Sequence, residues 1–128
     1  MIRIPDDFKD LLDRPILVAL ATVQPDGQPQ ITPVWADQAD GYVRFNTAAG
    51  RQKWKNLTER PQVTVMVVDP DNDQRYIEIR GTVARVEDDT DLINKLSNDY
   101  IGQDSPYLQG GETRVTFLIE PTKIFTQG

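Results

Sequence analysis

Short β-prone runs separated by tight turn signals constrain the fold of this chain more than any other feature of its sequence. Residues 16–23 and 62–68 are apolar on both alternating faces, which predicts strands buried between a core and a second covering surface. Pro25-Asp26-Gly27-Gln28 supplies Pro and Gly where a tight reversal needs them. We therefore expect residues 29–36 to pair with residues 16–23 as a hairpin.

The rest of the chain alternates between further strands and short helices. A second reversal at Asp40-Gly41 leads into a strand at 42–46, so the first three strands are expected to form a meander. Alternation at 75–86 predicts another strand, with Gly81 at a bend or a close approach. The remaining expected elements are a strand at 115–119, a strand at 123–126 returning beside it, and helices at 5–12, 50–58 and 88–100, the last capped near Asp88 or Asp89.

These segments together predict the fold class and the number of domains. Six or seven strands, two or three short helices and loops of hairpin length favour a mainly β antiparallel barrel over a parallel α/β sheet. At 128 residues the chain has the size of one domain, so we expect residues 1–128 to form a single core. Two strands that are apolar on both faces exceed what one small barrel interior can bury. The surplus face is expected to lie against a helix or a second subunit, and a homodimer is the simpler arrangement.

The composition excludes several kinds of chemistry. The chain has no cysteine and no histidine, which removes disulfides, the usual zinc ligands, thiol nucleophiles and serine–histidine–aspartate triads. A reaction whose difficult step is performed by a cofactor therefore fits best. Asp69, Asp71 and Asp73 alternate as in a calcium loop but lack its later bidentate Glu. They are interpreted as an ordinary solvated loop, and no metal site is expected.

Charge and hydropathy limit the expected partners. A formal net charge of −6 disfavours duplex nucleic acid, and the longest apolar run, residues 16–21, is too short to span a bilayer. Residues 1–8 lack the basic and apolar regions of a secretory signal. We therefore expect a cytoplasmic protein that binds a small molecule, with no nucleic-acid and no membrane partner.

Positive charge is nevertheless concentrated in residues 41–60. This segment holds five basic residues and one acid, a local balance of +4, which leaves −10 for the remainder of a chain whose net charge is −6. A helix that begins within it would offer unpaired N–H groups to an anion. Arg51 and Lys53, two residues apart, converge only if Arg51 lies in the turn before the helix, which Gly50 allows. The segment is interpreted as phosphate-binding, and a solvated basic helix is the alternative.

In this order the segments resemble the split-barrel flavin and deazaflavin oxidoreductases, the superfamily that includes pyridoxamine 5'-phosphate oxidase. The resemblance covers nearly the whole chain and implies a six- to seven-stranded antiparallel split β-barrel of the FMN-binding type. It rests on Leu20-Ala21-Thr22, Pro25-Asp26-Gly27-Gln28-Pro29, Thr32-Pro33-Val34-Trp35, Phe45-Asn46-Thr47, Arg51-Gln52-Lys53, Asn56-Leu57, Arg60-Pro61-Gln62-Val63, Tyr76-Ile77-Glu78-Ile79-Arg80-Gly81-Thr82 and Ile119-Glu120-Pro121.

The closest resemblance is to the branch that uses coenzyme F420, and it implies where the cofactor lies. In that branch a Ser or Thr, followed by Arg and Lys two apart, holds the coenzyme phosphate. Thr47, Arg51 and Lys53 stand at those positions, with Asn46 beside them. The resemblance also implies that the ring lies along the strand of Thr32, Pro33, Val34 and Trp35, and that Tyr76 and Arg80 close the pocket from the opposite subunit.

Several of these residues have a plainer interpretation. Pro33 is equally well explained as an ordinary edge-strand proline, and Arg80 as a surface ion pair with Glu78. Trp35 and Trp54 are interpreted as core or interface aromatics rather than as residues that stack on a cofactor ring.

The implied function is that of a coenzyme F420-dependent reductase that transfers a hydride between the deazaflavin and a small organic acceptor. FMN is the alternative cofactor, for an oxidase or reductase of the same fold. A non-catalytic carrier of a flavin or of F420 is the alternative class. No motif marks a catalytic residue.

Overall fold

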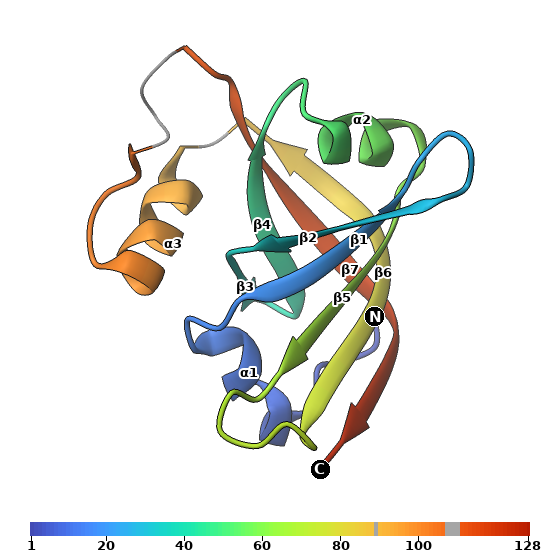
Figure 1. Cartoon of the computed structure of the whole chain (residues 1–128), viewed down its shortest axis with the longest axis vertical. Helices are drawn as coiled ribbons and strands as arrows, with labels where there is room; N and C mark the ends of the chain where they lie inside the picture. The colour runs from blue at the N-terminus through green and yellow to red at the C-terminus, as the bar shows by residue number, and fades with distance from the viewer. Residues whose placement is uncertain (89, 107–110) are drawn as a thin grey trace.

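In the computed structural model of the chain, residues 1–88, 90–106 and 111–128 are described. They form a seven-stranded antiparallel sheet that curls into a split barrel, with short helices at its ends and on its side (Figure 1). The elements are the 3-10 helix η1 (Asp6–Phe8), α1 (Asp10–Asp13), β1 (Val18–Val23), β2 (Pro29–Val34), β3 (Ala36–Ala39), β4 (Tyr42–Ala48), α2 (Gln52–Glu59), β5 (Gln62–Val68), β6 (Tyr76–Glu87), α3 (Asp91–Ile101) and β7 (Arg114–Gln127).

Closure of the barrel follows from the position of Trp35. The strands are ordered β2-β1-β5-β6-β7-β4-β3, so β2 and β3 lie at opposite edges of the sheet although only Trp35 separates them in the chain. One residue spans at most about 3.6 Å, so the sheet must curl until its two edges approach each other. The predicted hairpin of β1 and β2 is confirmed. The predicted meander is wrong, because the strand expected at 29–36 breaks at Trp35 and β4 pairs with β3 and β7 instead of β2.

The C-terminal strand also differs from the prediction. β7 runs unbroken from Arg114 to Gln127, so the expected return of residues 123–126 beside 115–119 is wrong. The chain bends at Pro121 without reversing. Pro121 lies opposite Gly81 at a bulge between β6 and β7, and a bulge tolerates a proline, which has no N–H to donate to the neighbouring strand. A Cβ atom on Gly81 would collide with the carbonyl oxygen of Glu120, which confirms the predicted close approach.

The hydrophobic core lies inside the curled sheet, and the helices close around it. Phe45 and Phe117 stack there with ring centroids 5.3 Å apart, and Leu11 and Leu12 of α1 cover one end of the barrel. Helix α2 lies over β1 and β4, and Trp54 packs against the core from this helix. Helix α3 lies against β4. Residues 114–119 of β7 are buried on both faces. None of the described helices is long and apolar enough to cross a membrane.

Two of the three predicted helices agree closely with the structure. Residues 5–12 form η1 and α1, and residues 50–58 contain most of α2. Helix α3 begins at Asp91, later than predicted, because strand β6 continues to Glu87. Thr90 precedes the helix without a side-chain cap, so Asp88 is not the capping residue, and Asp89 lies outside the described residues.

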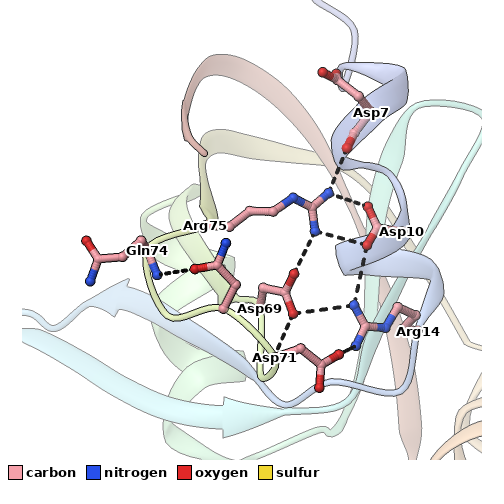
Figure 2. A network of polar contacts seen from close by, with 8 residues as sticks. Asp7, Asp10, Arg14, Asp69, Asp71, Gln74 and Arg75 are labelled. Atoms are coloured by element: carbon pink, nitrogen blue, oxygen red, sulfur yellow. Dashed lines mark hydrogen bonds and ion pairs between the residues drawn. The ribbon is translucent and has the colours of Figure 1, made fainter.

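A network of ion pairs joins the N-terminal helices to the loop between β5 and β6 (Figure 2). The Arg75 guanidinium donates to both carboxylate oxygens of Asp10, at 3.1 and 2.6 Å, and to Asp69 at 3.0 Å. It also lies 4.9 Å from the ring centroid of Phe8. Arg14 donates to Asp71 at 2.8 Å.

This network corrects the interpretation of the acidic loop. Asp69 is 8% exposed and contacts Arg14 as well as Arg75, so it is a buried structural carboxylate, whereas Asp73 is exposed. In the three described stretches, no group of three acids is placed to hold a metal ion. Asp69 and Asp71 therefore anchor the loop to the N-terminal helices, and Asp73 does not.

Candidate functional site

A pocket of about 160 Å³ opens where β4, α2, β7 and α3 meet the corner between β2 and β3. Seven of the ten predicted site residues line it. The lining residues are Pro33, Val34, Trp35, Asn46, Thr47, Arg51, Lys53, Ile93, Leu96 and Arg114. A larger hollow of about 410 Å³ lies beside residues 1–4 and Gly41, but it contains none of the predicted site residues.

The start of α2 places the basic side chains as the sequence predicts. Gly50 has φ +95°, a conformation that other residues rarely adopt, and it turns the chain out of β4. Arg51 is extended, with φ −72° and ψ 160°, and its carbonyl accepts from the N–H of Lys55 at 3.0 Å. Arg51 therefore lies in the turn before the helix, and Lys53 lies in the first turn of the helix.

Buried hydrogen bonds hold α2 to the barrel. Asn56 is fully buried, and its Nδ2 donates to Thr22 Oγ1 of β1 at 2.9 Å. Its Oδ1 accepts from Gln52 Nε2 at 2.8 Å. These contacts fix the helix from which Lys53 projects, whereas Lys55 is exposed.

Only part of the basic segment faces the pocket. Arg44 makes a bidentate pair with Asp37, at 2.9 and 2.7 Å, and the Nε of Arg60 donates to the carbonyl of Val23 at 2.7 Å. Both side chains therefore have structural partners. Of the five basic residues in 41–60, Arg51 and Lys53 are the two that line the pocket.

The sequence analysis missed three residues of the pocket lining, the apolar Ile93 and Leu96 and the charged Arg114. Arg114 begins β7, is 6% exposed, and its Nε donates to Asn46 Oδ1 at 2.8 Å. Asn46 Nδ2 in turn donates to Thr116 Oγ1 at 3.0 Å. Arg114 reaches the pocket because β4 and β7 pair with Ala48 opposite Arg114 and Asn46 opposite Thr116. No local pattern in the sequence reveals that pairing.

The pocket is strongly cationic. Lys53 is partly buried, and its ammonium pKa is lowered mainly by burial and further by the positive charges of Arg51 and Arg114. Within the described residues Lys53 has no ion-pair partner. Glu112 contacts Arg51 at 3.3 Å from the rim. With three cations on its wall and one carboxylate at its rim among the described residues, the pocket is suited to an anion with more than one negative charge.

Helix α3 supplies the apolar wall and holds Trp35. Ile93 and Leu96 line the pocket, and Trp35 stacks on Tyr100 with ring centroids 5.4 Å apart. The Tyr100 hydroxyl donates to the carbonyl of Ile16 at 2.6 Å and accepts from the N–H of Ala36 at 3.2 Å. Burial raises the pKa of this phenol. Trp35 thus packs as an interface aromatic between the corner of the barrel and α3.

Three predicted site residues do not line the pocket within this chain. Thr32 precedes Pro33 on β2 but is not among the lining residues. Tyr76 begins β6, opposite Val68. Arg80 pairs with Glu78 at 2.8 Å and lies 4.7 Å from the ring centroid of Phe125, so the surface ion pair considered for it is present.

A curled seven-stranded antiparallel sheet with a cationic pocket at one end defines the split-barrel class of flavin- and deazaflavin-binding proteins. The chain belongs to the pyridoxamine 5'-phosphate oxidase family, whose sequence profile matches residues 4–128. A search of curated proteins found no match.

Solved structures agree with this assignment. An F420 reductase is 34% identical, with a TM-score of 0.86 over 95% of this chain and 98% of its own. A conserved hypothetical protein from Mycobacterium tuberculosis is 22% identical, with a TM-score of 0.78 over 99% of this chain and 86% of its own. HupZ from Group A Streptococcus is 21% identical, with a TM-score of 0.71 over 96% of this chain and 93% of its own. The last two support the fold alone.

Proposed function

We propose that this protein is an oxidoreductase that binds the deazaflavin coenzyme F420 and transfers a hydride between it and a small organic acceptor. The observation that carries the proposal is the convergence of Arg51, Lys53 and Arg114 on one pocket beside Thr47. The 34% identity to an F420 reductase supports this choice of cofactor. The family supports the reaction class.

The residues present suit the phosphate of such a cofactor. Arg51 offers a planar fork to phosphate oxygens, Lys53 a compact charge and Thr47 a hydroxyl. The ring would lie along Thr32, Pro33, Val34 and Trp35, beside Asn46. A bound deazaflavin supplies the hydride-transfer chemistry. The chain binds and orients it, which requires neither histidine nor cysteine.

A second subunit would complete the site. A pocket of about 160 Å³ is smaller than the roughly 300–1,000 Å³ of usual ligand sites, so the ring needs further walls. The outer face of β2, β1 and β5 carries an apolar hollow of about 320 Å³ that includes Ile31 and Met66. We propose that a second copy covers this face as a homodimer and brings its own Tyr76 and Arg80 to the ring.

FMN is the second candidate cofactor, and the charge of the pocket favours it. Among the described residues, three cations line the pocket and the carboxylate of Glu112 lies at its rim, so positive charge is in excess there. A phosphate monoester carries about −1.5 to −2 at neutral pH, which suits that excess. An FMN-dependent oxidase or reductase and a non-catalytic carrier of either cofactor are therefore alternatives that the same experiment must separate.

The test begins with equilibrium titrations of FMN, F420 and riboflavin. Riboflavin has the FMN ring without the phosphate, so the ratio of FMN to riboflavin affinity isolates the phosphate contacts. We expect F420 to bind more tightly than FMN, and reduced F420 to be oxidised in the presence of organic acceptors. Tighter binding of FMN would favour the flavin alternative, and binding without turnover of any acceptor would favour a carrier. Failure to bind either cofactor would refute the proposed function.

A further inference from the structure

We propose that Arg114 is a further phosphate-binding residue, the buried cation of the pocket, and that Asn46 holds it in this role. The identity of the cofactor rests on the proposed function. The inference itself requires only that the pocket receives a phosphoryl group.

The position of Arg114 sets it apart from the other two cations. Arg51 precedes α2 and Lys53 lies within it, whereas Arg114 comes from β7, so the charges approach the pocket from separate elements. The Arg51 side chain is 52% exposed, while Arg114 is 6% exposed. A contact between charges is stronger where water is excluded. The buried guanidinium should therefore contribute more per contact than Arg51 at the rim.

Asn46 fixes the orientation of this guanidinium. The 2.8 Å bond from Arg114 Nε to Asn46 Oδ1 is backed by the 3.0 Å bond from Asn46 Nδ2 to Thr116 Oγ1. A guanidinium held in one plane loses little freedom when it binds an anion. Asn46 is thus a positioning residue, and its own place on the pocket wall follows from the pairing of β4 with β7.

The crowding of cations supports a ligand role over a purely structural one. Like charges that share a partly buried pocket repel one another. Here two further cations share the pocket, and the positive charges of Arg51 and Arg114 disfavour the protonated form of Lys53. This repulsion between cations raises the free energy of the empty protein. A bound anion would attract all three cations, which explains why they are gathered in one pocket.

The experiment compares Arg114→Gln with Arg85→Gln. Each variant removes one positive charge, but Arg85 is 65% exposed on β6 and pairs with Glu87, so it controls for net charge. The probes are inorganic phosphate, FMN and riboflavin. Arg114→Gln should weaken phosphate and FMN about ten- to a hundredfold and leave riboflavin unchanged, because only the phosphate contact is lost. Arg85→Gln should change all three by less than about twofold.

A structural role alone would give a different result. In that case Arg114→Gln would lower the melting temperature while the ratio of FMN to riboflavin affinity stayed at the parent value, and this would overturn the inference. If Arg114→Gln does not fold, Arg114→Lys carries the test. It keeps the charge but loses the planar fork, so the ratio should still fall severalfold, and an unchanged ratio would overturn the inference.

A second readout is the pKa of Lys53, followed by NMR of its Nζ. Removal of the Arg114 charge should raise this pKa, and phosphate should raise it in the parent protein.

Failure of the proposed function is distinguishable from failure of this inference. If the parent binds phosphate but neither FMN nor F420, the proposed function fails, while the phosphate titration of Arg114→Gln still tests Arg114. If the parent binds FMN or F420 and Arg114→Gln binds them equally well, this inference alone fails.

Discussion

At the scale of single residues, Lys53 and Arg51 should each contribute strongly to the affinity for a phosphate-bearing cofactor. Replacing either by Ala removes a charge-assisted contact of about 1.5–3 kcal/mol, so the dissociation constant should rise about ten- to a hundredfold. Folding should hardly change, because Arg51 is half exposed and Lys53 has no ion-pair partner within the described residues. Equilibrium titration with FMN and F420 measures the effect.

Lys55→Ala is the matched control, since Lys55 is an exposed cation on the same helix and does not line the pocket. It should bind nearly as well as the parent. Arg51→Lys should recover only part of the loss, because a point charge does not reproduce the planar fork. If Lys53→Ala and Arg51→Ala both bind as tightly as the parent, the segment is a solvated basic helix.

Glu112 should oppose anion binding, and its removal should therefore increase affinity. Its carboxylate lies 3.3 Å from Arg51 at the rim, with 39% of the side chain exposed, so it competes with an incoming phosphate for that guanidinium. Exposed ion pairs are worth about 0.2–1 kcal/mol, so Glu112→Gln should tighten phosphate and FMN by about 1.5- to fivefold. Glu59→Gln, which removes a carboxylate paired with Arg60, is the control. Weaker FMN binding by Glu112→Gln would contradict the competition.

At the scale of elements, the attachment of α2 to β1 should depend on Asn56. Asn56→Ala leaves Thr22 Oγ1 and Gln52 without their buried partner, which should lower the free energy of unfolding by about 1–3 kcal/mol. Chemical denaturation measures this loss. Thr58→Ala is the control, because its hydroxyl caps an exposed carbonyl, that of Lys55, on the same helix. Equal unfolding free energies for the two variants would show that α2 is held by its apolar contacts alone.

The elements also show which features a sequence can predict. The β1–β2 hairpin and the extended Arg51 before α2 depend on neighbouring residues, and local patterns predicted both. The reversal at Asp40-Gly41 was also predicted correctly. The pairing of the strand at 29–36 with the strand at 42–46 and the return of residues 123–126 beside 115–119 depend on which strands meet across the sheet, and these predictions were wrong. Arg114 was missed for the same reason, since its place is set by β4 across the sheet.

At the scale of the whole molecule, the Arg75 network should make stability depend on acidity. Hydrogen bonds from Arg75 hold the pKa of Asp10 below its usual value, and the backbone N–H of Asp71, followed by Arg75, does the same for Asp69. In the unfolded chain these aspartates have a pKa of about 3.9, and in the folded protein their pKa is lower. Their ionised carboxylates therefore stabilise the fold fully at pH values above about 3.9. This stabilisation is lost as the pH falls through the lower folded-state values.

Thermal unfolding from about pH 7 to about pH 2 should therefore show a decline in melting temperature that is steepest below about pH 4. Arg75→Gln should be less stable at neutral pH and should lose less on acidification, because both carboxylates return toward their ordinary pKa. Arg85→Gln should retain the parent profile. A parallel shift of the Arg75→Gln profile, with no change in slope below about pH 4, would show that Arg75 acts by packing on Phe8 instead.

The proposed dimer predicts a linked loss of assembly and binding. Ile31 is 67% exposed on β2 opposite Ala21, and Met66 of β5 lies opposite Ala19, so the three strands present one apolar face. A stable interface of this kind buries on the order of 2,000 Å² in total. The parent should sediment at twice 14.5 kDa at micromolar concentration.

Ile31→Asp should dissociate the dimer, because a charge would be buried without a partner. It should also weaken riboflavin as much as FMN, since the proposed partner residues Tyr76 and Arg80 contact the ring and not the phosphate. Ile101→Asp, at an exposed apolar position on α3, is the control for added charge and should remain dimeric. If Ile31→Asp is monomeric and binds both ligands like the parent, the whole cofactor site lies within one chain. If the parent itself sediments at 14.5 kDa, the proposed dimer is wrong.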